Sequence, residues 1–309
     1  MSELYTGRII KALAGFYYVK RYTDNEVYAC RARGIFRKRG HSPLVGDVTD
    51  FVVTHEGDKE GNIESIHERS SVLSRPTVAN VDLALLVFAL KDPVPNLHLL
   101  DRMLVALEYA GLEVVICFNK RDLVDEETIA EYSHKYDNIS YPVVCISGYD
   151  TGARSKLMPH LSGHLTTVCG PSGAGKSSLI NLLTGRETME VGAVSEKIKR
   201  GKQTTRHVEL SELYSGDGTN CTSGTYIVDT PGFSSLDLDY IQKESLGMYF
   251  PEIGIYEDEC KFNSCSHIYE ALSDCAVKRA LDAGRISDTR YESYRLFYEE
   301  LSQKKRYGS

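Results

Sequence analysis

The residues best suited to chemistry in this 309-residue chain are eight consecutive positions that read GPSGAGKS, residues 170–177. They fit the pattern G-x-x-x-x-G-K-[ST], whose glycines allow a tight turn and whose backbone N–H groups point at phosphate oxygens. An apolar strand predicted at 165–169 and a helix predicted at 178–183 supply the strand-to-helix setting that separates this motif from a chance glycine-rich turn. The sequence therefore predicts a nucleoside triphosphate site. Its phosphate-binding residues are Gly170, Pro171, Ser172, Gly173, Ala174, Gly175, Lys176, Ser177 and Ser178.

Two short motifs indicate which base is bound. Asn119-Lys120-x-Asp122 follows a buried strand predicted at 112–118, and Ser147-Gly148 follows the next predicted strand, 142–146. A carboxylate such as that of Asp122 can accept hydrogen bonds from both the ring N–H and the exocyclic amine of guanine, and adenine offers no such pair. We therefore expect GTP as the ligand, with Asn119, Lys120, Asp122, Ser147 and Gly148 at the base.

Two further segments are candidates for Mg²⁺ binding and for contact with the terminal phosphate. The polar stretch 186–209, predicted to be a loop, contains Gln203, Thr204 and Thr205, and a threonine in such a loop can complete the Mg²⁺ shell. Thr205 is the favoured ligand and Thr204 the alternative, beside the hydroxyl of Ser177. A strand predicted at 226–228 runs into Asp229-Thr230-Pro231-Gly232. Asp229 would hold Mg²⁺ through water, and the Gly232 N–H would meet the γ-phosphate.

The elements that must position these residues alternate between strand and helix. Residues 81–90 form a near-continuous apolar run, typical of a strand buried on both faces, and residues 97–109 have helical periodicity. Together with the strands before each motif, this alternation predicts an α/β fold with a parallel, doubly wound sheet. The base-reading motifs precede the phosphate loop, which reverses the usual order in GTPases, so the sequence predicts a circularly permuted P-loop GTPase domain.

Residues 1–70 read as five short strands separated by turns, which predicts a small β-barrel. The first 45 residues contain nine Lys or Arg against three Asp or Glu, although the whole chain carries a formal charge of −7. Tyrosines between these cations would suit single-stranded nucleic acid, by base stacking and phosphate contacts. The alternative is that the tyrosines pack the barrel and the charges form a solvated face.

Composition limits the class of protein. The chain is 42% hydrophobic and 26% charged, values of a soluble globular protein, and it has no apolar run long enough for a transmembrane helix. Residues 5–20 are interrupted by Arg8 and Lys11, which argues against a signal peptide. Eight cysteines in such a chain point to a reducing compartment with metal or packing roles. We expect a cytoplasmic monomer with no membrane association.

Four potential metal ligands lie close together near the C-terminus, with the spacing Cys260-x₄-Cys265-x-His267-x₇-Cys275. Three thiolates and an imidazole suit one closed, tetrahedral structural zinc site. The alternative is that these cysteines simply pack in a core. Predicted helices at 274–283 and 288–306 follow, and the second carries an apolar stripe that we interpret as a packing face.

The barrel, the permuted motif order and the Cys/His cluster together resemble the bacterial family of ribosome small subunit-dependent GTPases, over nearly the whole chain. Its motifs are matched by Pro43–Asp47, by Arg200-Gly201-x-x-Thr204-Thr205 and by Asp229–Phe233. The resemblance implies an oligonucleotide-binding (OB-like) barrel at 1–70 that binds nucleic acid, a permuted GTPase domain at 71–245 and a helical zinc-binding domain at 246–309. This chain departs from the family pattern at the metal site. Ala271 stands where the family usually has proline, and the gap between His267 and Cys275 is longer than is usual in the family.

The resemblance also implies an activity: hydrolysis of GTP to GDP and phosphate with Mg²⁺, stimulated by the small ribosomal subunit, in late maturation of that subunit and in contact with its rRNA. The predicted catalytic residues are Lys176, Thr205 and Gln203. Phe233 follows the D-x-x-G motif and cannot orient water, whereas Gln203 stands where the family usually carries histidine. His207 is a second candidate for positioning the water. The alternative function is a GTP-gated RNA-binding module that acts on another structured RNA.

Overall fold

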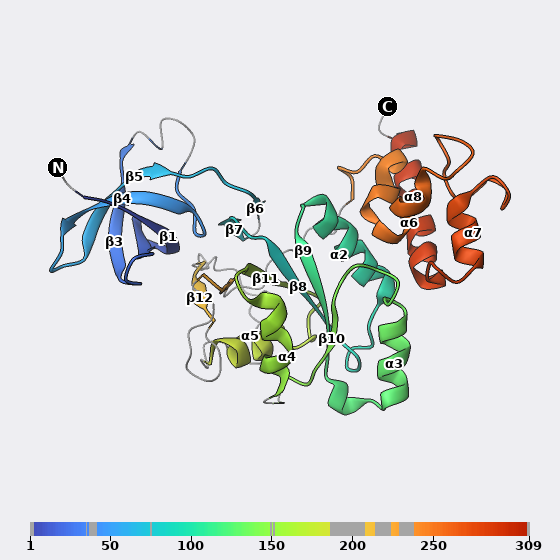
Figure 1. The fold of residues 1–309 in the computed structure, drawn as a ribbon, viewed down its shortest axis with the longest axis horizontal. Helices are drawn as coiled ribbons and strands as arrows, with labels where there is room; N and C mark the ends of the chain where they lie inside the picture. The colour runs from blue at the N-terminus through green and yellow to red at the C-terminus, as the bar shows by residue number, and fades with distance from the viewer. Residues whose placement is uncertain are drawn as a thin grey trace. The chain divides into compact units, whose positions relative to one another are not determined.

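The computed structural model (Figure 1) describes residues 3–34, 36, 42–74, 76–148, 150, 152–185, 208–213, 224–228 and 238–307. The chain separates into two compact units. The first comprises residues 1–85, 151–169 and 176–234, and the second comprises residues 86–150, 170–175 and 235–309.

The N-terminal strands form a closed five-stranded barrel with the order β1-β2-β3-β5-β4, in which β3 and β5 are parallel and the other described pairs antiparallel. This is the five-stranded OB-like barrel expected from the sequence. Its core is apolar because alternate residues face inward along each strand, including Ile9, Val19, Phe51 and Ile63, which are fully buried. The strands are β1 (Leu4–Leu13), β2 (Phe16–Arg21), β3 (Val27–Ala32), β4 (Val48–His55) and β5 (Glu60–Ile66).

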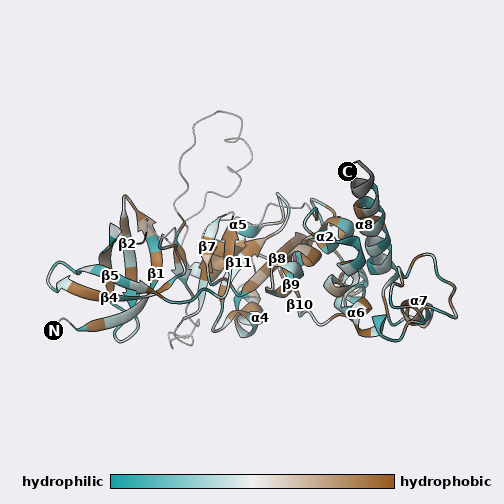
Figure 2. Ribbon diagram, turned by 90° about the horizontal axis from the view of Figure 1, so that it is seen from above, coloured by the Kyte–Doolittle hydropathy of each residue, from teal (hydrophilic) through white to brown (hydrophobic). Residues whose placement is uncertain are grey.

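A six-stranded sheet with the order β10-β9-β8-β11-β13-β12 forms the centre of the α/β fold. Strand β10 is parallel to β9, and β11 is parallel to β13, whereas β12 is antiparallel to β13. Every residue of β8 and β11 is buried, and both ribbons are largely brown in Figure 2. The strands are β8 (Leu83–Ala89), β9 (Glu113–Asn119), β10 (Val143–Cys145), β11 (Leu165–Cys169), β12 (Leu210–Glu212) and β13 (Tyr226–Val228).

The helices between these strands are α2 (Leu97–Tyr109), η1 (Arg121–Leu123), α3 (Glu126–His134), α4 (Gly152–Leu161) and α5 (Lys176–Thr184). Helix α2 begins where the Asn96 side chain accepts a hydrogen bond from the Leu99 N–H, and the Asp125 side chain caps α3 in the same way through Thr128. The cap at Asn96 explains why α2 starts where the helix predicted at 97–109 begins.

Several elements were not predicted from the sequence. Helix α4 contains Pro159 and starts at Gly152, and both residue types normally signal a break. The short strand β12 and the hairpin of β6 (Val72–Ser74) and β7 (Thr77–Ala79) have only three residues each, too few to show periodicity. Such elements are recognised only by their pairing.

The C-terminal region is helical, with η3 (Lys243–Tyr249), α6 (Pro251–Glu257), α7 (Ala276–Asp282) and α8 (Asp288–Tyr307). The predicted stripe of α8 is a packing face, since Tyr294, Phe297 and Leu301 are each at most 5% exposed. The Tyr294 ring meets Phe250 edge-on at a centroid distance of 5.5 Å. The predicted closed barrel, the α/β sheet and the helical C-terminal region are all present in the structure. In the part of the chain described here, none of the helices combines the length and the apolar character needed to cross a bilayer.

Candidate nucleotide and metal sites

The phosphate loop leaves the end of β11 and leads into α5, as the motif requires. Gly170 has φ of +135°, and a Cβ atom there would lie 2.0 Å from the Val87 carbonyl oxygen of β8. Only glycine avoids that collision, because it alone lacks a side chain at this point of closest approach. The first glycine of the motif therefore lets the loop pack directly against the backbone of β8.

Asn119 joins the base-reading motif to the phosphate loop. It is only 2% exposed at the end of β9, and its Nδ2 donates to the Ala174 carbonyl at 2.9 Å. Its Oδ1 accepts from the Lys120 N–H at 2.8 Å. Gly175 has φ of +90°, and a Cβ atom there would lie 2.2 Å from Asn119 Nδ2. The side-chain amide of Asn119 thus connects the N-K-x-D motif to the phosphate loop. These are two of the motifs that we predicted to bind one nucleotide.

The two predicted guanine-reading motifs lie at the ends of neighbouring parallel strands. The Arg121 N–H donates to the Ile146 carbonyl at 3.1 Å, which links the segment after β9 to the segment after β10. Ser147 is buried and Asp122 is exposed in η1. Lys120 has φ of +62°, and its Nζ donates to the Asp92 carbonyl. The fold therefore brings Asn119, Lys120, Asp122, Ser147 and Gly148 to the carboxyl edge of the sheet, where nucleotides bind in α/β folds.

Lys176, Ser177 and Ser178 form the first turn of α5, and all three are half-buried. The N–H groups of such a turn and the helix dipole favour an anion. Burial lowers the pKa of the Lys176 ammonium, and a neighbouring phosphate would favour its charged form again. The Ser177 hydroxyl, on the same turn, fits the oxygen-ligand preference of Mg²⁺.

The remaining predicted residues of the nucleotide site lie outside the described residues: Gln203, Thr204, Thr205, His207, Asp229, Gly232 and Phe233. Two described strands lie next to these residues in sequence: β12 begins at Leu210, and β13 ends at Val228. Their predicted roles therefore stay predictions.

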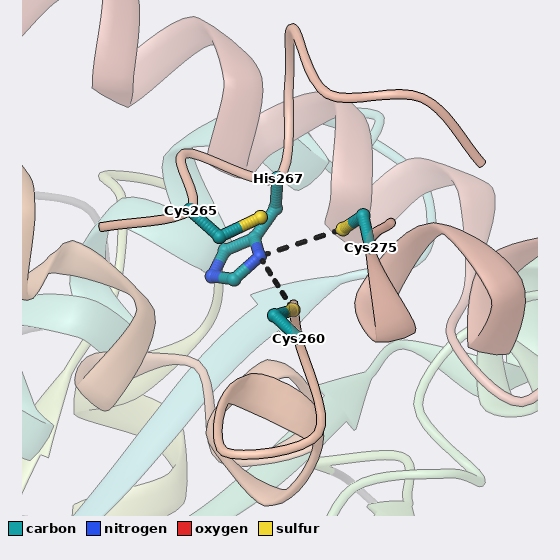
Figure 3. Close-up of side chains that lie close together, drawn as sticks. All are labelled: Cys260, Cys265, His267 and Cys275. Atoms are coloured by element: carbon teal, nitrogen blue, oxygen red, sulfur yellow. Dashed lines mark hydrogen bonds between the residues drawn. The ribbon is translucent and has the colours of Figure 1, made fainter. Parts of the chain in front are cut away.

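The four predicted metal ligands converge in the C-terminal region (Figure 3). The ligand atoms of Cys260, Cys265, His267 and Cys275 all lie within 4.8 Å of one another. His267 Nδ1 is 3.6 Å from the sulfur of Cys260 and 3.6 Å from that of Cys275. Three sulfurs and one imidazole nitrogen at this separation surround a point suited to one tetrahedral zinc ion, so the donor set fits structural zinc. The alternative of cysteines that merely pack in a core does not explain the inward imidazole.

Backbone and side-chain groups hold these ligands in place. The Ala276 N–H donates to the Cys260 sulfur and the Lys278 N–H to the Cys275 sulfur, at 3.3 and 3.4 Å. Burial opposes ionisation of Cys260, but the N–H groups of Ala276 and Val277 lower the pKa of its thiol. His267 Nε2 lies 3.4 Å from Glu257 Oε1, which orients the ring so that Nδ1 faces the sulfurs.

The structure adds two residues that the sequence motifs did not include. The Asp92 carbonyl accepts from Lys120, and Asp92 lies three positions after Ala89, the last residue of β8. Because this contact uses a backbone carbonyl, the side-chain type of Asp92 gave no signal for it. Glu257 contacts His267 from α6, and no motif marks it, because the contact depends on how α6 packs.

Comparison with known proteins places the chain in a family. The model of the RsgA GTPase family matches residues 66–239, and that of the RsgA N-terminal domain matches residues 6–63. The small ribosomal subunit biogenesis GTPase RsgA of Agathobacter rectalis is 45% identical over 98% of this chain and 100% of its own length. The protein of the same name from Alkaliphilus metalliredigens is 44% identical over 97% of this chain and 99% of its own.

Solved structures agree with this similarity. The crystal structure of YloQ, a circularly permuted GTPase, superposes with a TM-score of 0.80 at 37% identity, covering 98% of this chain and 96% of that one. YjeQ from Thermotoga maritima gives a TM-score of 0.79 at 32% identity, covering 97% and 99% of the two chains. The predicted circularly permuted GTPase fold is confirmed, and on the family models, the full-length relatives and the solved structures the chain belongs to the RsgA family of GTPases.

Proposed function

We propose that this GTPase acts in the biogenesis of the small ribosomal subunit, as the names of its relatives indicate for those proteins. The observation that carries the proposal is the Asn119–Ala174 hydrogen bond, which ties the base-reading edge to the phosphate loop in a chain similar to those relatives over nearly its full length. The GTP-binding residues are those named from the sequence, from Asn119 to Gly232.

In this proposal the chain contributes mainly positioning and charge, as phosphoryl transfer requires. Backbone N–H groups of residues 170–178 hold the phosphates, and Lys176 neutralises charge on the outer two. Ser177, Asp229 and one of Thr204 and Thr205 would hold Mg²⁺, which when bound offsets charge on the β- and γ-phosphate oxygens. Asp122 selects guanine, and Gln203 orients the attacking water through its amide.

The role of Gln203 can be tested by single-turnover hydrolysis. Gln203→Ala should lower the rate about 100-fold while GTP affinity changes little, because a contact made mainly in the transition state affects chemistry more than binding. Gln203→His should retain activity. A parental rate in Gln203→Ala would assign the water to His207 or to a group of the partner.

We further propose a three-domain organisation with nucleic-acid contact by residues 1–70, GTP binding by 71–245 and zinc binding by 246–309. The binding partner would be the small ribosomal subunit and its rRNA. The chain would act in the cytoplasm as a monomer. Relatives named for ribosomal biogenesis support this partner.

The partner is tested by measuring GTP turnover of the full chain alone, with purified small subunits, with large subunits and with bulk RNA. We expect a rise in turnover only with small subunits. Equal stimulation by bulk RNA would favour the alternative, a GTP-gated module for another structured RNA, and stimulation by large subunits alone would contradict the proposal.

A further inference from the structure

Two cross-strand pairs face each other within the first compact unit. On the barrel, Arg8 of β1 is the register partner of Lys20 of β2, and on the central sheet Glu212 of β12 is the register partner of Tyr226 of β13. The Lys20 ammonium is paired with the Glu212 carboxylate, with side chains only 10% and 16% exposed. The Arg8 guanidinium lies over the Tyr226 ring at 5.6 Å. We call these four residues the clasp.

The clasp extends along the same strands. Lys11 and Glu209 form an isolated antiparallel bridge, and their side chains make an ion pair at 2.7 Å. Arg8 also donates to the Gly46 carbonyl at 3.3 Å. One backbone bridge, two ion pairs and one cation–π contact therefore join β1 and β2 of the barrel to β13, to β12 and to Glu209, which directly precedes β12.

The positive charges of Arg8 and Lys20 explain why these strands of the barrel favour contact with Glu212 and Tyr226. Two like charges directly opposite each other on neighbouring strands destabilise a sheet, so Arg8 and Lys20 disfavour an isolated barrel. Glu212 and Tyr226 supply the carboxylate and the aromatic face that offset them. The other described Lys and Arg residues of the first three strands and the residue after them also have protein partners: Lys11 with Glu209, Arg21 with Asp24, Arg31 with Phe16 and Arg33 with Glu64. Among these cations, Lys20 is the one whose side chain is most enclosed by a partner outside the barrel, at 10% exposure against Glu212.

The strands held by the clasp adjoin both predicted γ-phosphate segments. Thr205 precedes Leu210, the first residue of β12, by only five positions, and Asp229 directly follows Val228, the last residue of β13. A shift of either strand would displace the chain that runs from it. Catalysis of phosphoryl transfer depends on the placement of the groups around the γ-phosphate. Such a shift would therefore alter the rate of GTP hydrolysis more than the affinity for GTP.

We propose that Lys20 and Glu212, supported by Arg8 and Tyr226, are positioning residues for GTP hydrolysis: the barrel holds in register β12 and β13, the two strands that lie next in sequence to the residues predicted to meet the γ-phosphate. The proposal rests on the GTPase roles given to Thr205 and Asp229 in the proposed function. It makes the barrel a part of the hydrolytic machinery as well as a candidate nucleic-acid domain.

The test uses the full chain with the substitution Lys20→Met, which keeps an apolar stem and removes the charge. We expect single-turnover hydrolysis to slow about tenfold, with GTP affinity within about twofold of the parent, because placement and not binding is lost. Amide hydrogen exchange in residues 208–213 and 224–228 should become faster, since both strands lose their anchor. The exchanged pair Lys20→Glu with Glu212→Lys should restore both readouts to within about threefold of the parent.

Lys59→Met is the matched control, because it removes the exposed Lys59–Glu26 ion pair within the same barrel and leaves the clasp intact. It should behave as the parent. If Lys20→Met does not fold, as judged by thermal melting, Glu212→Gln tests the same contact with almost no change in volume. Parental hydrolysis and exchange in the single variants, or no recovery in the exchanged pair, would overturn the proposal. Intrinsic hydrolysis and exchange need no ribosome, so a failure of small-subunit stimulation would contradict only the proposed function.

Discussion

At the scale of single residues, the amide and the carboxylate of the predicted base-reading motif have different surroundings. Asn119 is buried, and its side chain donates to Ala174 and accepts from Lys120, so it connects the end of β9 to the phosphate loop. Asp122 is exposed in η1, where its carboxylate is available to a ligand. Selectivity for guanine should therefore depend on Asp122, and the shape of the site should depend on Asn119.

Asp122→Asn should move base preference from guanine towards xanthine, because the amide can donate to the extra carbonyl that xanthine carries. We expect GTP affinity to fall by a factor of about 100 or more, since a buried polar mismatch is costly. Binding of fluorescent GTP and XTP analogues measures the change, with Asp125→Asn, at the cap of α3, as the control. Unchanged preference would show that another residue reads the base.

Glu257→Gln should weaken zinc retention, because the carboxylate beside His267 Nε2 orients the imidazole. Loss of a group in this position commonly reduces metal affinity by about 10–100-fold. Competition with a chromogenic chelator measures zinc affinity and needs no enzymatic activity. Glu259→Gln, an exposed neighbour, is the control. Equal zinc affinity in both variants would remove Glu257 from the metal site.

At the scale of elements, the phosphate loop is shaped by what it touches. Its first glycine packs on β8, and its glycine before Lys176 packs on the Asn119 side chain at the end of β9. The Asn119–Ala174 hydrogen bond spans residues 55 positions apart in sequence. The loop therefore keeps its conformation through two strand ends as well as through its own glycines.

Gly175→Ala tests this dependence. The new Cβ would fall 2.2 Å from Asn119 Nδ2 at a backbone φ of +90°, so both the loop and Asn119 must move. We expect GTP affinity to fall at least about tenfold, the effect of losing well-placed phosphate contacts. Gly163→Ala is the control, because it has φ of +87° but nothing within 4 Å of the added atom. Isothermal titration calorimetry measures the GTP affinity of both variants and so separates the effect of the collision from that of backbone strain. Equal GTP affinities in the two variants would show that the collision with Asn119 has no effect on binding.

At the scale of the whole molecule, a buried ion-pair network ties the zinc-binding region to the base-reading half of the GTPase fold inside one compact unit. Arg290 of α8 is fully buried and donates to Asp101 of α2 at 2.9 Å and to Glu252 of α6 at 2.7 Å. Tyr136 also donates to Asp101, at 3.1 Å. Helices α6 and α8 are thus fastened to α2 by charge as well as by apolar packing.

Arg290→Met should destabilise this unit by about 3–5 kcal/mol, because it leaves two buried carboxylates without their cation. Urea unfolding followed by circular dichroism measures the loss. Lys135→Met, which removes a surface ion pair with Glu131 on α3, should cost less than about 1 kcal/mol. A loss of similar size in the two variants would show that the network contributes little to the stability of the unit.

The sequence alone was enough for everything that depends on short spacing. The phosphate loop, the N-K-x-D motif and the Cys/His cluster each lie within a stretch of at most 16 residues, so residue type and spacing indicate their chemistry. Alternating and continuous apolar runs likewise predicted the barrel strands, β8, β9 and the main helices, because burial imposes a period on each element. The permuted order followed directly from the order of the motifs.

Only the tertiary structure decided the contacts between residues distant in the chain. The brace from Asn119 to the loop, the support of His267 by Glu257 and the pairing of Arg8 and Lys20 with Tyr226 and Glu212 leave no local pattern. Each depends on strand register and helix packing, which are set by the whole buried core at once. For that reason the sequence could not indicate that Arg8, Lys11 and Lys20 of the barrel contact Tyr226, Glu209 and Glu212.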